Sequence, residues 1–344
     1  MSRETMEPPL AAQQTRAVPA RRPHRGRGCP PRQRQRGVAL IVAILLVALG
    51  TIIAAGMAYD NAMTARRAGA SFDFDQALLV AEGAEAFAAY GLQQTVVQNN
   101  PKQLVYPAQG WSRTLGPEEV LPGIMLQASL EDLQGRFNVN ELVMPDGNTP
   151  NPGAIEAFQR LLTKLGLDPK FADLLVDWID ENTTPRPDGA EDSVYMELDP
   201  PFRTPNMPIS STSALLALPG FTRADFNKLA PYIVALPPKT LINLCSASPQ
   251  LLDALSGIEQ YSLNPAGFEQ DRQAAGTCFP TNFLQAIPAN LRPQVESLVT
   301  QTSVWFRLTS FVGEGSTEFA VYTTLYVDPL THKLRPVMRS FTPD

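Results

Sequence analysis

Histidine is scarce in this sequence, and the familiar catalytic motifs are missing. Of the two histidines, His24 lies in a basic N-terminal segment and His332 stands alone near the C-terminus. The motifs Gly-x-Ser-x-Gly and His-Glu-x-x-His, the P-loop and the dinucleotide fingerprint are all absent. These absences argue against an enzyme. Asp177 and Asp180 could be imagined as the acid–base pair of a membrane-anchored hydrolase, but a helical pair beside a metal-binding loop explains their spacing better.

Cysteine is scarce as well, which excludes a disulfide-dense scaffold. The chain has three cysteines, of which Cys29 lies in the basic N-terminal segment. In an oxidising compartment, Cys245 and Cys278 could form one disulfide that closes a loop of about 33 residues and stabilises the fold by roughly 3–4 kcal/mol. Two buried thiols are the alternative.

Charge is absent from residues 38–59, which read VALIVAILLVALGTIIAAGMAY. A helix of this length spans the ~30 Å hydrocarbon core of a membrane. Arginines precede the apolar run, so the positive-inside rule places the N-terminus in the cytoplasm and the body outside it. A cleaved secretory signal is the competing interpretation, but the run is longer than a signal core and lacks a following Ala-x-Ala-like site.

The two sides of the apolar run differ in charge. Residues 1–37 hold nine arginines and two glutamates, a net charge of +7. Removing them from the chain's 28 basic and 34 acidic residues leaves 19 and 32, so residues 38–344 carry a net charge of −13. An acidic body argues against nucleic acid or an anionic membrane surface as the main partner, and suits divalent cations or basic protein surfaces.

Proline is absent between Pro31 and Pro101, and the stretch after residue 59 is rich in alanine. One helix over about residues 38–98 would be ~90 Å long. Its outer half carries a stripe at intervals of three and four residues. The stripe consists of Leu78, Ala81, Glu82, Glu85, Ala89 and Leu92. A helix that extends so far beyond a membrane suits a subunit that packs into a bundle of its own kind.

Strand patterns occur on both sides of a long helical region. Residues 123–131 alternate, and residues 303–312 and 318–327 are aromatic, β-branched and separated by a Gly-rich turn. A third strand is expected near residues 333–339. Helices are expected between these strands, at residues 155–165, 170–179, 213–218, 223–235 and 249–255. Neither group of strands makes a complete sheet alone, so the pattern predicts an α+β fold with a helical unit inserted between strands of one sheet.

Eight acidic residues lie between positions 177 and 199, opposed only by Arg186. Nearby prolines and Gly189 make this segment a loop rather than a helix face. Ca²⁺ takes six to eight oxygen ligands, often from a loop that wraps around it. The spacing does not match the EF-hand template, so an acidic surface loop is the alternative to a calcium site.

Two segments are similar to helix-hairpin-helix units, residues 213–235 and 243–258. Such hairpins often hold DNA backbones, and a membrane-anchored periplasmic DNA-uptake protein is therefore the alternative function. Residues 213–257 carry three basic and two acidic side chains, a net charge of only +1. DNA binding requires several phosphate contacts, so packing is the preferred explanation.

The sequence Arg-Gln-Arg-Gln-Arg-Gly before Val38 resembles the cleavage site of type IV pilins and pseudopilins. The resemblance implies that prepilin peptidase cuts after Gly37 and leaves Val38 as the mature N-terminus. The leader is long for this family. Val42 occupies the fifth mature position, where most pilins carry a glutamate that is thought to neutralise a neighbour's terminal amine. A buried charge is tolerable only when paired, so a subunit without it fits best at a filament end.

Several motifs make the resemblance to the minor pseudopilin K family of type II secretion systems close. In family order they are residues 132–140, 177–180 and 189–192, Tyr195, a loop containing Asn206, and residues 242–244. The resemblance implies a pseudopilin fold, in which a long N-terminal helix packs on a small antiparallel sheet, with a large inserted helical domain. It also implies bound structural calcium, with expected ligands Asp180, Asp188, Glu191, Asp192 and Asn206.

The resemblance also implies a division of the chain and a set of partners. We expect a leader (1–37), a long helix (38–98), the first part of the sheet (99–140), the inserted helical domain with its calcium loop (141–300) and the closing strands (301–344). The expected partners are minor pseudopilins of the I and J types, the pseudopilus, prepilin peptidase and the inner membrane, with no nucleic acid. The implied function is a tip or capping subunit that initiates the periplasmic pseudopilus and supports protein export across the outer membrane.

Overall fold

The computed structural model describes residues 37–94, 104–275, 278, 283–315 and 317–342. The leader up to residue 36, with Cys29 and His24, lies outside these residues. The chain divides into two compact units, residues 1–66 and residues 67–344. Helix α1 (Val38–Leu92) extends from the first unit into the second, and two further residues continue it as a π-helical turn. The remaining part of the predicted helix, residues 95–98, is outside the described residues.

The first unit is described from residue 37 and consists of the start of α1. Its side chains from Val38 to Tyr59 are exposed, although nearly all are apolar. Among the described residues, α1 is the one helix that is long and apolar enough to cross a membrane, and none of the apolar stretch is buried. A surface of this kind requires lipid or partner helices around it.

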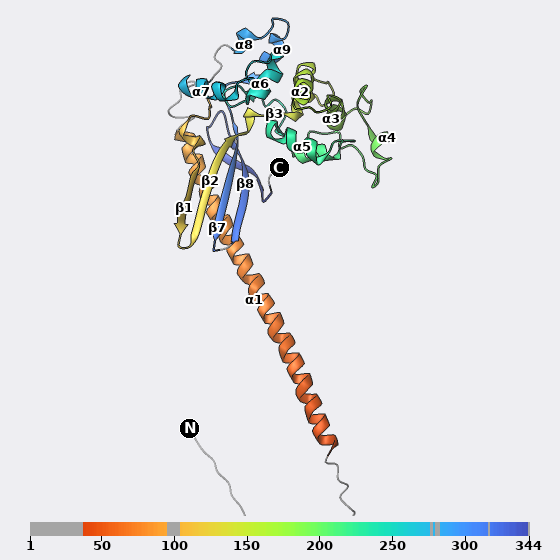
Figure 1. Ribbon diagram of the computed structural model, residues 1–344, viewed down its shortest axis with the longest axis vertical. Coiled ribbons are helices and arrows are strands. Elements are labelled where there is room, and N and C mark those ends of the chain that lie inside the picture. Colours follow the sequence, from red (N-terminus) through yellow and green to blue (C-terminus); the bar gives the residue numbers. More distant parts are fainter. Residues whose placement is uncertain (1–36, 95–103, 276–277, 279–282, 316, 343–344) are drawn as a thin grey trace, which may run out of the picture. The chain divides into compact units, whose positions relative to one another are not determined.

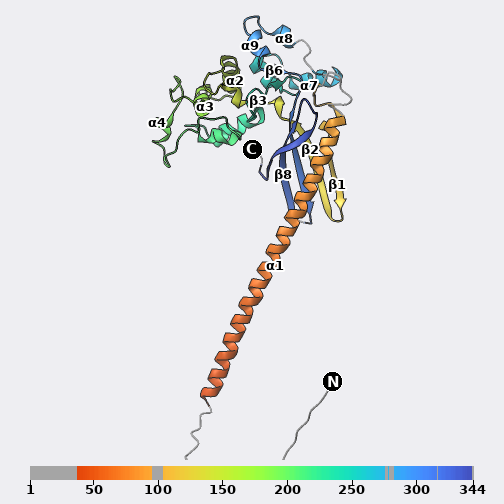
Figure 2. The same ribbon diagram turned by 180° about the vertical axis from the view of Figure 1, so that it is seen from behind.

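In the second unit, the last turns of α1 pack against a five-stranded sheet (Figures 1 and 2). The contact uses small side chains, Ala77, Ala81 and Ala84, which let the helix approach the sheet closely. Glu85 is also buried there. Its carboxylate accepts hydrogen bonds from the Thr323 hydroxyl at 2.8 Å and from the Arg339 guanidinium at 2.8 Å. A partnered carboxylate therefore fixes the register of α1 on the sheet.

The sheet is antiparallel, in the order β1-β2-β7-β8-β9. Its strands are β1 (Leu115–Leu121), β2 (Ile124–Asp132), β7 (Trp305–Glu314), β8 (Thr317–Val327) and β9 (Leu334–Ser340). Alternate residues of the central strands face α1, and Leu126, Phe306 and Leu325 are among the most buried. The predicted strands correspond to β2 and β7–β9, whereas β1 was not expected.

Between β2 and β7 the chain forms a helical region with its own core. Its α-helices are α2 (Pro152–Lys164), α3 (Phe171–Ile179), α4 (Asp192–Tyr195), α5 (Arg223–Leu229), α6 (Pro249–Ser256), α7 (Pro265–Ala275), α8 (Phe283–Ala286) and α9 (Arg292–Glu296). Short parallel pairs join β3 (Phe137–Asn138) to β4 (Ile233–Val234) and β5 (Ile242–Asn243) to β6 (Val299–Thr300). Phe137 stacks on Phe158 in the core, with ring centroids 5.1 Å apart.

Two expected helices differ from the structure. Residues 212–217 form a 3-10 helix instead of an α-helix. The helix expected over residues 223–235 ends at Leu229; a 3-10 turn containing Pro231 and strand β4 follow. Proline lacks the N–H that a helix interior needs, which explains this early end. The α+β fold class, with a long N-terminal helix on an antiparallel sheet and a helical insertion, is confirmed.

Candidate functional site

The end of α3 carries two buried carboxylates. All nine residues of α3 are buried, including Asp177. Asp180, the C-cap, is 1% exposed. One Asp177 oxygen, Oδ2, accepts a hydrogen bond from the Arg186 backbone N–H at 3.0 Å. Oδ1 of Asp177 and Oδ1 of Asp180 have no hydrogen-bond partner. Burial of an unpartnered charged oxygen is costly, so these two atoms are unusual.

Glu191 adds a third buried carboxylate, directly before α4. It is 4% exposed, and neither carboxylate oxygen has a hydrogen-bond partner. The hydroxyl of Tyr195, on α4, is also buried without a partner. The Tyr195 ring lies 5.1 Å from the ring of Trp178, in an edge-to-face arrangement. Aromatic packing thus holds α4 against α3 and closes the apolar side of the site.

The pKa values show that these carboxylates disfavour ionisation without a cation. Burial raises the pKa of Asp177 to about 6, with repulsion from Asp180 adding to it. Burial likewise raises the pKa of Asp180 to about 6. For Glu191, burial and then repulsion from Asp177, Asp180 and Asp192 raise the pKa to about 7. Carboxylate repulsion thus adds to burial at Asp177 and Glu191, whereas burial is the raising cause at Asp180.

Gly189 makes room for this arrangement. A Cβ atom at this position would collide with the Asp177 carboxylate, and its next neighbour would be the Arg186 backbone nitrogen at 3.1 Å. The guanidinium of Arg186 points to another acid, since its Nε donates to Asp173 at 2.7 Å. The Arg186 side chain is therefore committed to Asp173, and the free oxygens of Asp177 and Asp180 accept no bond from it.

The expected calcium ligands fall into two groups. Asp180 and Glu191 lie in the buried cluster, and the buried Asn206 Oδ1 also has no hydrogen-bond partner. Asp188 is exposed. Asp192 is engaged otherwise, because its carboxylate accepts bonds from Arg203 at 3.0 Å and from the Thr204 backbone N–H at 3.0 Å. The sequence argument did not select Asp177, although its spacing of three residues from Asp180 was a usable signal.

The buried oxygens suit a hard divalent cation. Ca²⁺ prefers carboxylate, amide and backbone oxygens, and it would supply the positive charge that the cluster lacks. In the described part of the chain, no three or more His, Cys, Asp and Glu side chains form a group that could hold a metal ion by themselves. A calcium site here would therefore also use Asn206 or backbone carbonyls. The residues fit a calcium ion because their buried oxygens have no hydrogen-bond partner within the protein.

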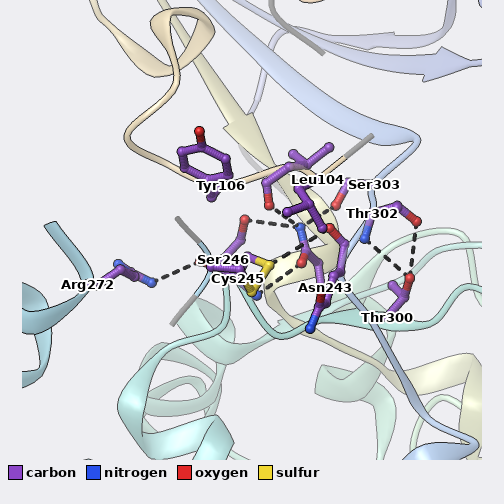
Figure 3. The surroundings of a disulfide bond; sticks show 12 residues. Leu104, Tyr106, Asn243, Cys245, Ser246, Arg272, Thr300, Thr302 and Ser303 are labelled. Atoms are coloured by element: carbon purple, nitrogen blue, oxygen red, sulfur yellow. Dashed lines mark hydrogen bonds between the residues drawn. A yellow bond between two sulfur atoms is a disulfide. The ribbon is translucent and has the colours of Figure 1, made fainter. Parts of the chain in front are cut away.

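The two remaining cysteines are bonded to each other in the structure. The disulfide joins Cys245, just after β5, to Cys278. Its neighbour Asn243 lies at a polar junction (Figure 3). The Asn243 side-chain amide donates to the Val105 carbonyl and to Asp132 Oδ2, each at 2.8 Å. Burial raises the pKa of Asp132. The junction ties the helical region to the end of β2 and to the segment before β1.

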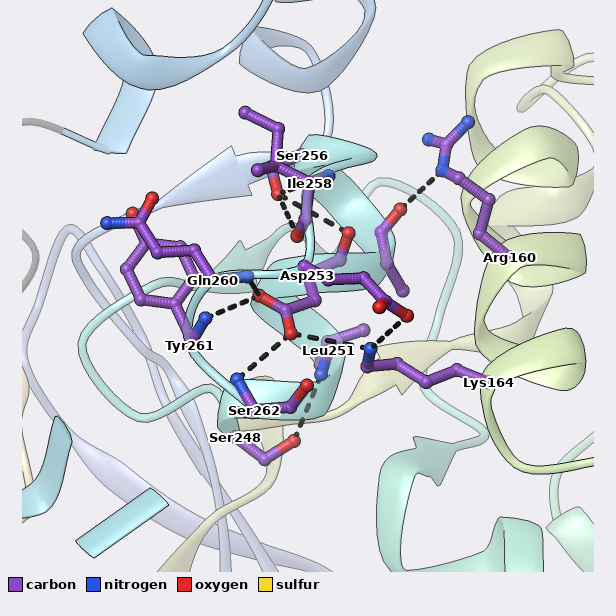
Figure 4. A network of polar contacts seen from close by, with 12 residues as sticks. Arg160, Lys164, Ser248, Leu251, Asp253, Ser256, Ile258, Gln260, Tyr261 and Ser262 are labelled. Carbon is purple, nitrogen blue, oxygen red and sulfur yellow. Dashed lines mark hydrogen bonds and ion pairs between the residues drawn. The ribbon is translucent and has the colours of Figure 1, made fainter. Parts of the chain in front are cut away.

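The second helix-hairpin-helix-like segment contains a buried carboxylate that is bound by backbone N–H groups just after the segment. Asp253 of α6 is 4% exposed and accepts hydrogen bonds from the backbone N–H groups of Gln260, Tyr261 and Ser262 at 2.8–3.1 Å (Figure 4). The Lys164 ammonium lies 3.4 Å from it. The loop amides that follow α6 are therefore already occupied by Asp253.

The expected processing position coincides with the start of α1. Gly37 is the first described residue and lies just outside the helix, and Val38 begins it. Val42 is exposed within the apolar stretch. A cut between Gly37 and Val38 would leave the helix whole, with an apolar residue at its fifth position.

Comparisons with known proteins cover much of the chain. A family model described as type II secretion system (T2SS), protein K, matches residues 135–238. The type II secretion system protein K of Klebsiella pneumoniae is 33% identical over 261 residues, 73% of this chain and 79% of that protein. Its counterpart from Pseudomonas aeruginosa is 32% identical over 236 residues, 66% of this chain and 70% of that protein.

The fold is also similar to a solved structure, the GspK-GspI-GspJ complex from the type 2 secretion system of enterotoxigenic Escherichia coli. The match has a TM-score of 0.67 and 23% identity, and covers 81% of this chain and 100% of the matched chain. At that identity, the likeness establishes the shared architecture.

Proposed function

The chain belongs to the type II secretion system protein K family, and we propose that it is the tip subunit that initiates the periplasmic pseudopilus. The family assignment confirms the resemblance drawn from the motifs, and it makes the chain a minor pseudopilin. The comparisons give no support to the DNA-uptake alternative. The single observation that carries the tip position is the apolar Val42 at the fifth position after the proposed cut.

Processing and membrane anchoring both involve the start of α1. Prepilin peptidase cuts after Gly37, and residues 38–59 stay in the inner membrane as a single-pass anchor with the body in the periplasm. The arginines that precede Gly37 and the acidic body that follows support this orientation. Because Val42 offers no carboxylate, the subunit cannot neutralise a neighbour's terminal amine in the membrane. At the tip of the filament, the subunit has neighbours on one side, and it does not need to neutralise a further terminal amine.

The helical insertion supports the same position. It occupies the chain between the end of β2 at Asp132 and the start of β7 at Trp305, so it contains more residues than the sheet. Stacked subunits of a helical filament leave little room for such an insertion. At the tip, the space above the subunit is empty. The subunit then seeds the filament that pushes folded substrates through the outer membrane.

The outer face of α1 supports helix-to-helix assembly with minor pseudopilins of the I and J types. In the second unit, four large apolar side chains of α1 are 60–67% exposed. At 100° per residue they fall within about 80° of one another, opposite the alanines that contact the sheet. These residues are Phe72, Leu79, Phe87 and Tyr90. We name them the outer stripe.

Calcium belongs to this proposal as a structural ion. The residues that would hold it are Asp177, Asp180, Glu191 and Asn206, whose free oxygens are buried. It would neutralise the acids at the end of α3 and thereby fix the loop between α3 and α4. No catalytic step is assigned to it, and we propose that the subunit acts by assembly alone.

Assembly with purified partners tests this function. The processed chain, extracted in detergent, should form a stable complex with I-type and J-type minor pseudopilins on size-exclusion chromatography. Leu79→Glu places a charge in the outer stripe and should weaken the complex at least tenfold. Ser71→Glu, on an exposed part of α1 away from the stripe, is the matched control. Failure to form a complex, or equal complexes with both variants, would refute helix-mediated assembly.

A further inference from the structure

A groove runs along the seam between the sheet and the helical region, and it is built from three adjoining cavities. The largest, about 1090 Å³, lies between α5 and β9. A cavity of about 230 Å³ shares Ser210, Arg307 and Met338 with it. A third, of about 440 Å³, shares Trp305 and Val337 with the second. We call this continuous surface the seam groove.

The seam groove is cationic, although the body of the protein is acidic. Six basic residues and no acidic residue line the groove. By contrast, residues 38–344 contain 19 basic and 32 acidic residues. The six are Arg136, Arg223, Lys239, Arg307, Arg335 and Arg339. Six of the 19 basic residues in this part of the chain thus line one groove.

Several of these cations are open to an incoming ligand. Arg223, Lys239 and Arg335 are exposed. The guanidinium groups of Arg223 and Arg335 lie over the rings of Phe226 and Tyr326, at 5.8 and 5.3 Å from the ring centroids. Arg335 also interacts electrostatically with Asp328. Arg136 and Arg339 differ, because they pair with Glu131 and with Glu82 and Glu85. The attraction for an anion therefore comes chiefly from Arg223, Lys239 and Arg335.

Apolar side chains alternate with the charges along the groove. Trp305 lies against Tyr326, with ring centroids 4.7 Å apart. Val337 and Met338 of β9 are 53% and 39% exposed in the same walls. A ligand that covers this surface must bring apolar groups as well as negative charge. Nucleic acid fits this poorly, since the body's net charge of −13 repels it.

The edge of the sheet supplies a third feature. β9 pairs with β8 on one side and with no described strand on its other side. Residues 337–340 of β9 all line the groove, so both the strand and its side chains border it. An unpaired strand edge binds extended peptides through backbone hydrogen bonds, and neighbouring side chains select the sequence.

We propose that the seam groove binds an extended acidic segment of a partner protein, one that alternates carboxylate and apolar side chains and adds to the sheet along β9. Charge complementarity selects its acids, Val337 and Met338 of β9 receive its apolar groups, and the free edge of β9 receives its backbone. The site is separate from the outer stripe and the calcium cluster, so the proposal stands independently of the assembly role.

Binding of a defined peptide to the processed full chain in detergent tests the proposal. The probe is a labelled peptide of about nine residues, ~30 Å long when extended, in which glutamate or aspartate alternates with valine. Fluorescence anisotropy should show binding that weakens as salt rises. A peptide with lysine at the acidic positions should not bind. A peptide with methylated backbone nitrogens should bind at least tenfold more weakly.

Variants locate the binding site. Arg223→Glu combined with Arg335→Glu should weaken peptide binding about tenfold or more, on the scale of two reversed surface charge contacts. Lys228→Glu, on the same helix as Arg223, and Arg113→Glu, near β1, are exposed controls outside the groove and should bind as the parent does. Thermal melting should confirm that all variants fold.

Several results would overturn the proposal. They are no binding of the acidic peptide, equal binding by the double variant, and equal binding of the lysine peptide. Unchanged affinity of the methylated peptide would also overturn it, because strand addition would then be excluded. Displacement of the peptide by single-stranded DNA or by vesicles containing anionic lipid would assign the groove to those ligands instead.

Discussion

Asp253 and the cluster of Asp177, Asp180 and Glu191 are both buried in the helical region, but different groups surround them. Burial alone would raise the pKa of Asp253, yet hydrogen bonds from Ser262 and from backbone N–H groups hold it below its ordinary value. In the cluster, burial and mutual repulsion raise the pKa values to about 6 and 7. A satisfied carboxylate stabilises the fold by itself, whereas an unsatisfied group of carboxylates needs a cation from outside.

Removal of calcium is expected to change the stability of the protein more than any other test of this difference between the two sites. At free calcium about a thousandfold above Kd, binding adds roughly 4 kcal/mol to the free energy of unfolding. EDTA should then lower the Tm by about 10 °C, as followed by circular dichroism. An excess of magnesium should restore less of the lost Tm than calcium does, because Mg²⁺ is reluctant to shed its waters. An unchanged Tm would remove calcium from the account.

Replacement of Asp253 should cost less and should not depend on calcium. Asp253→Asn puts an amide NH₂ toward backbone donors and removes the charge beside Lys164, so a loss of about 2–3 kcal/mol is expected in urea denaturation. Glu259→Gln is the matched control, because Glu259 is exposed and also pairs with Lys164. The account predicts that Asp253→Asn loses the same free energy of unfolding in calcium and in EDTA. A loss seen only in calcium would erase the distinction between the two sites.

Glu191→Gln should act in opposite directions in the two conditions. With calcium, the variant loses a ligand and should be less stable than the parent by roughly 1–2 kcal/mol. With EDTA, removal of one buried, repelling charge should leave it as stable as the parent or slightly more so. Destabilisation of the same size in both conditions would mean that Glu191 is an ordinary structural side chain.

The dependence on pH should distinguish the two sites by the sign of its effect on stability. Asp177, Asp180 and Glu191 bind protons more tightly when folded, so the EDTA-treated protein should lose stability as pH rises from about 4 through 7. Asp253 has the opposite sign: its contribution is present above about pH 4 and is lost below it. Melting curves in EDTA between pH 4.5 and 8 should therefore fall with pH. A rise over this range would contradict the assigned pKa directions.

Some of the fold could be predicted from local sequence because local and tertiary preferences agree there. The aromatic and β-branched stretches became β7 and β8, and the proline-free, alanine-rich stretch became α1. Strand β1 could not be predicted, since it contains Gly116, Pro117, Glu118 and Glu119 and has few strand-forming residues. It is a strand because it pairs with β2, a tertiary contact that local composition does not encode.

The candidate site divides in the same way. Acidic composition and resemblance pointed to the loop and to Asp180 and Glu191. Composition cannot tell which acids are buried, and burial separates Asp177 from the exposed Asp188. Nor does composition show that Asp192 is held by Arg203. The seam groove was also invisible in the sequence, because its cations come from five separate stretches of chain that only the fold brings together.

The central claim is that the chain is processed at the membrane into a subunit that begins with an apolar helix. Intact-mass measurement and N-terminal sequencing of protein extracted from membranes of cells with prepilin peptidase test it directly. The account predicts a mature chain that begins at Val38. Recovery of the unprocessed chain from such cells, or a start after Tyr59 that removes the apolar stretch, would contradict it.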